Sequence, residues 1–154
     1  MRFLYNRIIA DYQIKQQNMS IKEREKEIVD EFALFPEWMD KYEYLIELGR
    51  SLPAIEEADK TDENLIKGCQ SRVWLKCNVK DGRLWFTADS DAIITKGIIS
   101  LLIKVYNGET PKDILAAPPE FIKEIGLQEN LSPTRANGLA SMIERIKDYA
   151  VEAV

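Results

Sequence analysis

The chain holds two cysteines, and one of them lies where its thiol could react with another molecule. Cys69 sits in the polar stretch GCQS, just ahead of the apolar run VWL. A structural cysteine usually lies within such a run, as a small buried hydrophobic residue. A reactive cysteine works as its thiolate, which nearby cations and backbone N–H groups favour and apolar burial opposes. Position alone therefore leaves two interpretations open, a functional nucleophile and a buried structural thiol.

The residue types in the chain limit the chemistry that this thiol can perform. There is no histidine, which removes the commonest general base near neutral pH and the commonest metal ligand. Two cysteines cannot supply a Cys/His zinc site or four thiolates for an iron–sulfur cluster. Without a paired base, a Cys–His hydrolase is also disfavoured. We therefore expect a thiol that accepts an atom from a more reactive donor, with no metal site and no cofactor.

The second cysteine lies in a predicted hairpin. Apolar residues alternate over 73–79, and Asp81-Gly82 is a strong signal for a two-residue turn. Residues 73–88 are therefore predicted to form an antiparallel hairpin in which Cys77 faces Phe86 on the inner side. We expect Cys77 to pack in the core. A disulfide between the two cysteines is disfavoured, because their spacing is not C-x-x-C and a reducing cytosol opposes it.

The same register brings the acidic stretch DSD at 89–91 close to the Cys69 loop. It sets Trp74 opposite the first residue of that stretch, and Cys69 precedes Trp74 by only five positions. The stretch could be a metal site or a general-acid pair. An N-cap at Ser90 or Asp91 for the following helix explains these residues with fewer assumptions. Trp74 is predicted to be either a wall of the thiol pocket or an ordinary packing residue.

Three basic residues are candidates for contacts near the thiol. Lys67 and Arg72 flank Cys69, although alternate loop residues could point away from it. Arg135 lies near the start of the last predicted helix, where the helix dipole favours acidic residues instead. This mildly unfavourable position leaves two interpretations open, simple surface exposure and the binding of an anion or a partner carboxylate.

Helices are predicted on both sides of the hairpin. Helical periodicity and capping signals place them at 20–35, at 38–48 with Gly49 ending the helix, from 94 to near Gly108, from Thr110-Pro111, briefly near 121–125, and from Ser132-Pro133 to 150. Residues 50–63 are polar and are expected to form a loop. The predicted fold is α+β, a small antiparallel sheet packed by flanking helices.

The composition is that of an ordinary globular domain. The 154 residues suit a single domain, with 45% hydrophobic and 31% charged residues. We find no membrane-spanning run of about 18 apolar residues and no signal peptide, so a cytoplasmic location is expected. The net charge of −5, without a Lys/Arg cluster interleaved with aromatics, argues against a nucleic-acid partner.

Residues 1–18 differ in charge from the rest of the chain. They carry three basic residues and one acidic residue, against 18 basic and 25 acidic residues in 19–154. Met19 is followed by Ser20, a predicted helix N-cap with Glu23 three residues on. We expect the working domain to span 19–154. Residues 1–18 are then an optional extension or the product of an upstream start codon, and a short docked helix is the alternative.

Several segments resemble the SufE family of sulfur-acceptor proteins. The segment EWMDKYEYLIELGRSLP at 37–53 matches the family's first conserved region. The others are NLIKGCQSRVWL at 64–75, DSDA at 89–92, KG at 96–97, TPKDIL at 110–115 and LSPTRANGL at 131–139. These segments occur in the family's order and at compatible spacings, over residues 20–150.

The resemblance implies both a fold and a function. The family fold is α+β and similar to that of IscU-type scaffolds. The cysteine matching Cys69 receives sulfane sulfur from the persulfide of a PLP-dependent cysteine desulfurase of the SufS/CsdA type, which it thereby stimulates. It then passes the sulfur to a SufBCD-like iron–sulfur scaffold complex. The resemblance thus implies a carrier rather than an enzyme, and PLP belongs to the partner.

The resemblance also assigns roles to individual residues. Asp91 matches a position facing the cysteine loop, and Arg135 matches an arginine at the desulfurase interface. Four residues match the thiol-loop environment: Gly68, Gln70, Ser71 and Trp74. Two other functions stay open, an iron–sulfur cluster scaffold and an interaction module whose cysteine is structural. The identity of the desulfurase, the final sulfur recipient and the formation of a homodimer also stay open.

Overall fold

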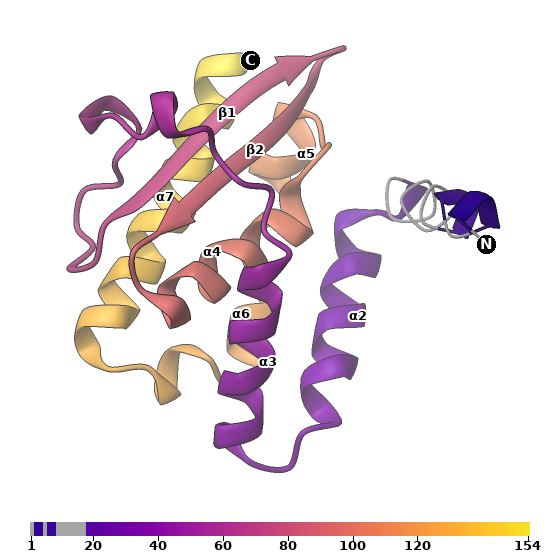
Figure 1. The fold of residues 1–154 in the computed structure, drawn as a ribbon, viewed down its shortest axis with the longest axis vertical. Coiled ribbons are helices and arrows are strands. Elements are labelled where there is room, and N and C mark those ends of the chain that lie inside the picture. Colours follow the sequence, from indigo (N-terminus) through magenta and orange to yellow (C-terminus); the bar gives the residue numbers. More distant parts are fainter. Residues whose placement is uncertain (1, 5, 9–17) are drawn as a thin grey trace.

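The computed structural model describes residues 2–4, 6–8 and 18–154 (Figure 1). From residue 21 onward the elements are α2 (Ile21–Ala33), α3 (Trp38–Arg50), the 3-10 turns η1 (Glu57–Asp59) and η2 (Asp62–Asn64), β1 (Val73–Lys80), β2 (Arg83–Ser90), α4 (Ile93–Tyr106), α5 (Pro111–Ala116), α6 (Phe121–Glu124), η3 (Gln128–Asn130) and α7 (Pro133–Ala153). This order confirms the predicted α+β class. Most of the predicted extension lies outside the described residues, so the domain boundary near Met19 stays a prediction.

The hairpin has the predicted register. β1 and β2 pair antiparallel over their full length, with Cys77 opposite Phe86 and Trp74 opposite Asp89. The Asp81-Gly82 turn has positive φ at both residues, as a type I′ turn requires. Val79 differs from the other inward positions, because 59% of its surface is exposed. Its cross-strand partner Leu84 is fully buried and bonded to the chain at Gly108 and Glu109, so at this end of the hairpin the core covers β2 while β1 lies at its edge.

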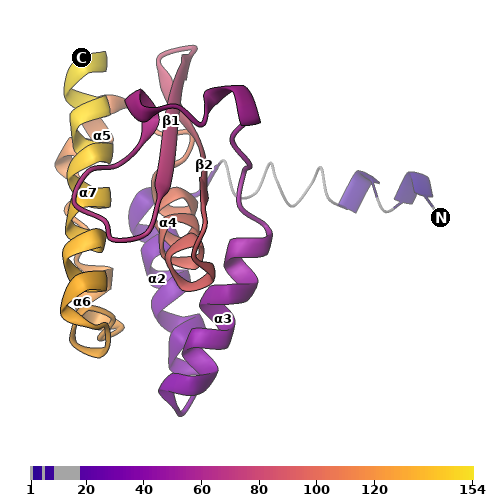
Figure 2. The ribbon, with the colours of Figure 1, turned by 60° about the vertical axis from the view of Figure 1, so that its left-hand side comes forward.

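Helix α4 is the centre of the fold. Its composition is strongly apolar, and ten of its residues are buried, so it has no broad solvent face. Figure 2 shows α4 and the hairpin between α7 on one side and α3 on the other. Helix α3 packs against α4 through glycines, since a Cβ on Gly97 would lie 2.2 Å from the carbonyl oxygen of Leu45.

This packing corrects the predicted end of α3. Gly49 was expected to end the helix, but α3 continues to Arg50 and Gly49 lies inside it, buried. A Cβ on Gly49 would lie 3.1 Å from the backbone nitrogen of Gly97. Gly49 therefore serves the close approach of two helices and not a C-cap.

Capping residues account for three helix starts. Ser20, Thr110 and Ser132 each accept a hydrogen bond from the backbone N–H three residues on, which confirms the N-cap predicted at Ser20 and the helix starts predicted at Thr110 and Ser132. The prediction for α4 is wrong. Its N-cap is Ala92, and no side chain caps it, because the Asp91 carboxylate bonds Arg72 and the Ser90 hydroxyl oxygen accepts the N–H of Ala92 itself.

None of the described helices combines the length and the apolar composition that crossing a bilayer would require.

Candidate functional site

Cys69 lies at the tip of a loop whose two ends are tied together. The backbone N–H of Ile66 donates to the carbonyl of Val73 at 2.8 Å, and Leu65 pairs with Trp74 as an isolated bridge. Lys67 and Gly68 form a local turn, and within the described chain no backbone–backbone hydrogen bond ties residues 67–71 to another element. The loop is therefore fixed at its base and free of backbone ties at its tip.

The acidic stretch at 89–91 forms the second anchor of this loop. The Asp91 carboxylate accepts the backbone N–H of Arg72 at 3.0 Å. The Arg72 carbonyl in turn accepts the hydroxyl of Ser90 at 2.8 Å and the backbone N–H of Asp91 at 3.3 Å. These bonds confirm that the stretch neighbours the thiol loop. They also explain why the Asp91 carboxylate does not cap α4.

Two glycines let the loop lie directly on α7. Gly68 has φ +92, so the backbone requires glycine there, and a Cβ would lie 2.4 Å from the Ser141 hydroxyl oxygen, which would have to rotate away. Gly138 lies beneath Cys69, and the cysteine Sγ is 3.6 Å from the Gly138 carbonyl oxygen. A Cβ on Gly138 would lie 3.4 Å from that sulfur. The thiol therefore rests against bare helix backbone.

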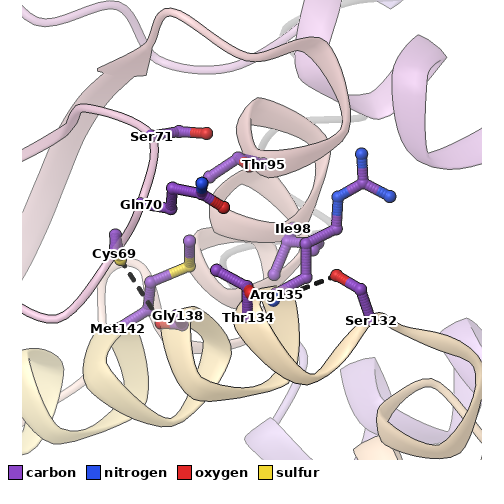
Figure 3. Close-up of a pocket in the computed structure, with 10 residues that line it drawn as sticks. All are labelled: Cys69, Gln70, Ser71, Thr95, Ile98, Ser132, Thr134, Arg135, Gly138 and Met142. Atoms are coloured by element: carbon purple, nitrogen blue, oxygen red, sulfur yellow. Dashed lines mark hydrogen bonds between the residues drawn. The ribbon is translucent and has the colours of Figure 1, made fainter.

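A pocket of about 300 Å³ opens beside this thiol. The loop, α4 and α7 each supply part of its wall (Figure 3), which is made by Cys69, Gln70, Ser71, Thr95, Ile98, Ser132, Thr134, Arg135, Gly138 and Met142. Thr95, Ile98 and Met142 are buried, whereas the rest of the wall is mostly polar and more exposed. In Figure 3 the guanidinium of Arg135 lies on the far side of the pocket from Cys69.

The electrostatics of the pocket favour a neutral thiol. Burial raises the pKa of Cys69, and no charged neighbour offsets that effect. The nearby acidic and basic groups pair with one another instead. Asp89 lies 2.7 Å from the Lys60 ammonium and 3.3 Å from that of Lys96. Although partial burial opposes ionisation, these hydrogen bonds hold the pKa of Asp89 below its usual value.

The predicted site residues divide into two groups. Gln70, Ser71 and Arg135 line the pocket together with Cys69, and Gly68 fixes the loop on α7. Trp74 is not a wall of the pocket, contrary to one interpretation of its position. It lies on the outer face of the hairpin, where the Lys60 ammonium stands 5.5 Å from its ring centroid. Asp91 anchors the loop and does not line the pocket.

Sequence reasoning missed several parts of the site. The missed wall residues come from α4 and from the N-cap and first turns of α7: Thr95, Ile98, Ser132, Thr134, Gly138 and Met142. Gly138 carried a usable signal, because a glycine inside an amphipathic helix often marks a close contact. The other missed wall residues carried no sequence signal for a site, since apolar and hydroxyl residues on helices serve many purposes.

The described residues include no group of three or more histidine, cysteine, aspartate or glutamate side chains arranged to hold a metal ion. Cys77 is not part of the Cys69 pocket. It is half-buried on β1 opposite Phe86, and both cysteines are free thiols.

Comparison with known proteins places this geometry in a family. The SufE family model, described as an Fe-S metabolism associated domain, matches residues 26–150. An uncharacterized SufE-like protein of Rhizobium meliloti is 41% identical over 129 residues, covering 80% of this chain and 92% of that protein. An uncharacterized SufE-like protein of Synechocystis is 36% identical over 124 residues, covering 80% of this chain and 78% of that protein.

A solved structure supports the fold. The solution structure of a hypothetical protein from Thermus thermophilus superposes with a TM-score of 0.70 at 23% identity, covering 84% of this chain and 95% of that one. The family match spans the Cys69 loop, the hairpin and α4, together with nearly all of α7. The chain therefore belongs to the SufE family, whose domain is associated with iron–sulfur metabolism.

Proposed function

We propose that the protein is a sulfur carrier in which Cys69 accepts sulfane sulfur from the persulfide of a SufS/CsdA-type cysteine desulfurase. The observation that carries the proposal is the position of Cys69, at the tip of a loop tied only at its base and beside an open pocket. Membership of a family associated with iron–sulfur metabolism agrees with this role.

The transfer is a thiol–disulfide type of exchange. The Cys69 thiolate attacks the outer sulfur of the donor persulfide, and a new S–S bond forms at Cys69. The S–S bond of the donor breaks at the same time, and the donor cysteine leaves as a thiolate. One neutral sulfur atom moves, so no external oxidant or reductant is needed. The freed desulfurase is then ready for another cysteine, which accounts for its stimulation.

The resting geometry protects the thiol before this step. Cys69 is half-buried, donates to the Gly138 carbonyl and has a raised pKa. A neutral, partly buried thiol reacts slowly with oxidants, because the thiolate is the reactive form. Docking of the desulfurase would draw the loop tip away from α7 and expose the sulfur. We propose that this movement restricts the transfer to the correct partner.

Residues at the pocket mouth supply the docking contacts in this proposal. Arg135 is exposed at the start of α7, with its guanidinium turned away from Cys69 (Figure 3), and would bind a carboxylate of the desulfurase. Gln70 and Ser71 would adjust the loop around the incoming persulfide. PLP belongs to the desulfurase, and the carrier itself would use no cofactor or metal.

The loaded carrier would deliver its sulfur to a SufBCD-like iron–sulfur scaffold complex in the cytoplasm. A scaffold role for this chain itself has less support. Scaffolds of related fold use several cysteines, whereas Cys77 lies on the hairpin outside the Cys69 pocket.

Intact-mass measurement tests the proposal directly. The protein is incubated with a SufS/CsdA-type desulfurase and cysteine, and each molecule should gain the mass of one sulfur atom, which a reductant removes. Cys69→Ser should abolish the gain, whereas Cys77→Ser should retain it. Sulfur bound equally by the Cys69→Ser protein would refute the carrier role. Desulfurase stimulation that survives in Cys69→Ser without a reducing acceptor would instead favour an interaction module.

A further inference from the structure

Gly138 occupies an unusual position for a glycine. It lies within the 21-residue helix α7 and is buried against the thiol loop. Glycine in a helix interior is unfavourable relative to alanine, because it loses more backbone entropy on folding. A buried glycine in such a helix therefore requires a contact that explains it. The contact here is Cys69, whose Sγ lies 3.6 Å from the Gly138 carbonyl oxygen.

The chemistry of this contact depends on the protonation of the sulfur. A backbone carbonyl only accepts hydrogen bonds, so a neutral thiol donates to it and a thiolate has no proton to donate. A thiolate at the same place would put a negative sulfur against a carbonyl oxygen in a partly buried site. We call this contact between Cys69 Sγ and the Gly138 carbonyl the thiol seat. The seat stabilises the neutral thiol and disfavours its anion.

Charged groups around the seat do not reverse this preference. From α7, the Arg135 guanidinium lies across the pocket from the sulfur (Figure 3). From the loop, Lys67 and Arg72 are exposed. From α4, Lys96 is paired with Asp89 at 3.3 Å. Burial is the cause of the raised pKa of Cys69.

We propose that Gly138 is a positioning residue that seats the neutral thiol of Cys69 and keeps it unreactive until the loop leaves α7. The use of this seat in sulfur transfer rests on the proposed function, but the seat itself is a property of the free protein. The loop is suited to leave, because within the described chain no backbone–backbone hydrogen bond ties its tip to α7 or to any other element. Its base stays fixed through Val73 and Asp91.

A graded pair of substitutions tests the seat. A Cβ on Gly138 would meet Sγ at 3.4 Å, an ordinary contact, so Gly138→Ala should keep the thiol seated. The longer side chain of Gly138→Leu would occupy the place of the sulfur and expel it. The measurement is the rate of alkylation of Cys69 by iodoacetamide from pH 6.5 to 10, followed by peptide mass mapping. In this reaction the sulfur loses its proton to solvent, attacks carbon and releases iodide.

We expect the pH profile of Cys69 alkylation to shift in Gly138→Leu and in neither of the other variants. Each unit of pKa changes the thiolate fraction about tenfold below the pKa, so Gly138→Leu should alkylate about tenfold faster at pH 7.5 if its profile moves down by one unit. Gly138→Ala should stay within about twofold of wild type, since its seat is intact. Asn137→Leu, at the neighbouring position, is the matched control and should match wild type.

The melting temperature of each variant shows whether faster alkylation comes from displacement of Cys69 in a folded protein or from general unfolding. Alanine and leucine both favour helix more than glycine does, so neither variant should lose helicity through propensity. A folded Gly138→Leu protein with wild-type alkylation would overturn the proposal. If Gly138→Leu fails to fold, Gly138→Val replaces it. The proposal would also be overturned if the alkylation rate of Cys69 in the wild-type protein depended on pH as that of a free cysteine derivative does. None of these readouts requires a desulfurase, so failure of the seat and failure of the carrier role are distinguishable.

Discussion

The loop of Cys69 and the strand of Cys77 bury their thiols to a similar degree, yet they hold them differently. Both sulfurs are half-buried, and burial raises the pKa of both. Cys77 lies in the middle of β1 and is paired with Phe86 across the hairpin, so its backbone cannot move without breaking the sheet. Cys69 lies on a loop tip that only side-chain contacts and packing hold on α7. Backbone attachment, rather than burial, distinguishes a movable thiol from a structural one.

Replacing Gly68 should give the largest change in the reactivity of Cys69 relative to that of Cys77. Gly68→Ala places a side chain at φ +92 and 2.4 Å from the Ser141 hydroxyl oxygen. The left-handed backbone costs roughly 1–2 kcal/mol for a non-glycine residue, and the Ser141 hydroxyl must also rotate away from the new Cβ. We expect the loop to leave α7, with faster alkylation of Cys69 and unchanged alkylation of Cys77. Peptide mass mapping of the alkylated protein measures both rates.

Gly126→Ala offers a matched control. This glycine also has positive φ, at +69, but a Cβ there would approach no described neighbour closer than 3.6 Å. It should cost stability without changing the reactivity of Cys69. Equal acceleration of both cysteines in Gly68→Ala would indicate general unfolding and contradict the comparison.

The pH dependence of stability should report on Cys77. Burial, with a smaller effect of Glu152, raises its pKa to about 11. A raised pKa means that the folded protein holds the proton more tightly. Its contribution is therefore complete below the ordinary pKa of about 9 and is lost as the pH rises toward 11. The free energy of unfolding should fall by about 1 kcal/mol over this range. This is well below what the same pKa difference would contribute in a fully buried group, because the Cys77 site is half-exposed.

Urea unfolding at pH 8 and pH 10.5 measures this effect against a Cys77→Val variant. Other groups titrate in the same range, so the informative quantity is the difference between the two proteins. The difference in unfolding free energy should change by about 1 kcal/mol between the two pH values, with wild type losing more stability. A pH-independent difference would show that Cys77 ionises normally.

Loosening the base of the Cys69 loop should have the smallest effect. Asp91→Ala removes the carboxylate that accepts the Arg72 N–H at 3.0 Å. The Ser90 hydroxyl still bonds the Arg72 carbonyl, so the anchor is weakened and not lost. We expect a loss of about 0.5 kcal/mol, the low end of the range for a hydrogen bond, because this bond is exposed to solvent. Hydrogen exchange should rise at the protected amides of Ile66 and Arg72 and stay constant in β1. Asp91→Asn, which keeps an acceptor oxygen, should behave like wild type.

The accuracy of the sequence predictions follows the range of the interactions concerned. The hairpin register was predictable, because a two-residue turn and alternating side chains fix it locally. The caps at Ser20, Thr110 and Ser132 were predictable for the same reason, since each bonds only three residues on. The N-cap assigned to Ser90 or Asp91 failed because the Asp91 carboxylate accepts the N–H of Arg72, a distant residue in sequence, and the Ser90 hydroxyl oxygen accepts the N–H of Ala92, ahead of the helix.

Residue order alone was enough to predict the fold class, the hairpin and the choice of Cys69 as the thiol that stands outside the core pattern. The folded chain was needed to show that Gly49 joins two helices, that Trp74 lies away from the pocket, and that Gly138 underlies the thiol. Local bonds and periodicity involve neighbouring residues, so they can be recognised along the chain. Contacts between a loop and a helix about 70 residues later depend on how all the intervening elements pack, and no spacing in the chain records that.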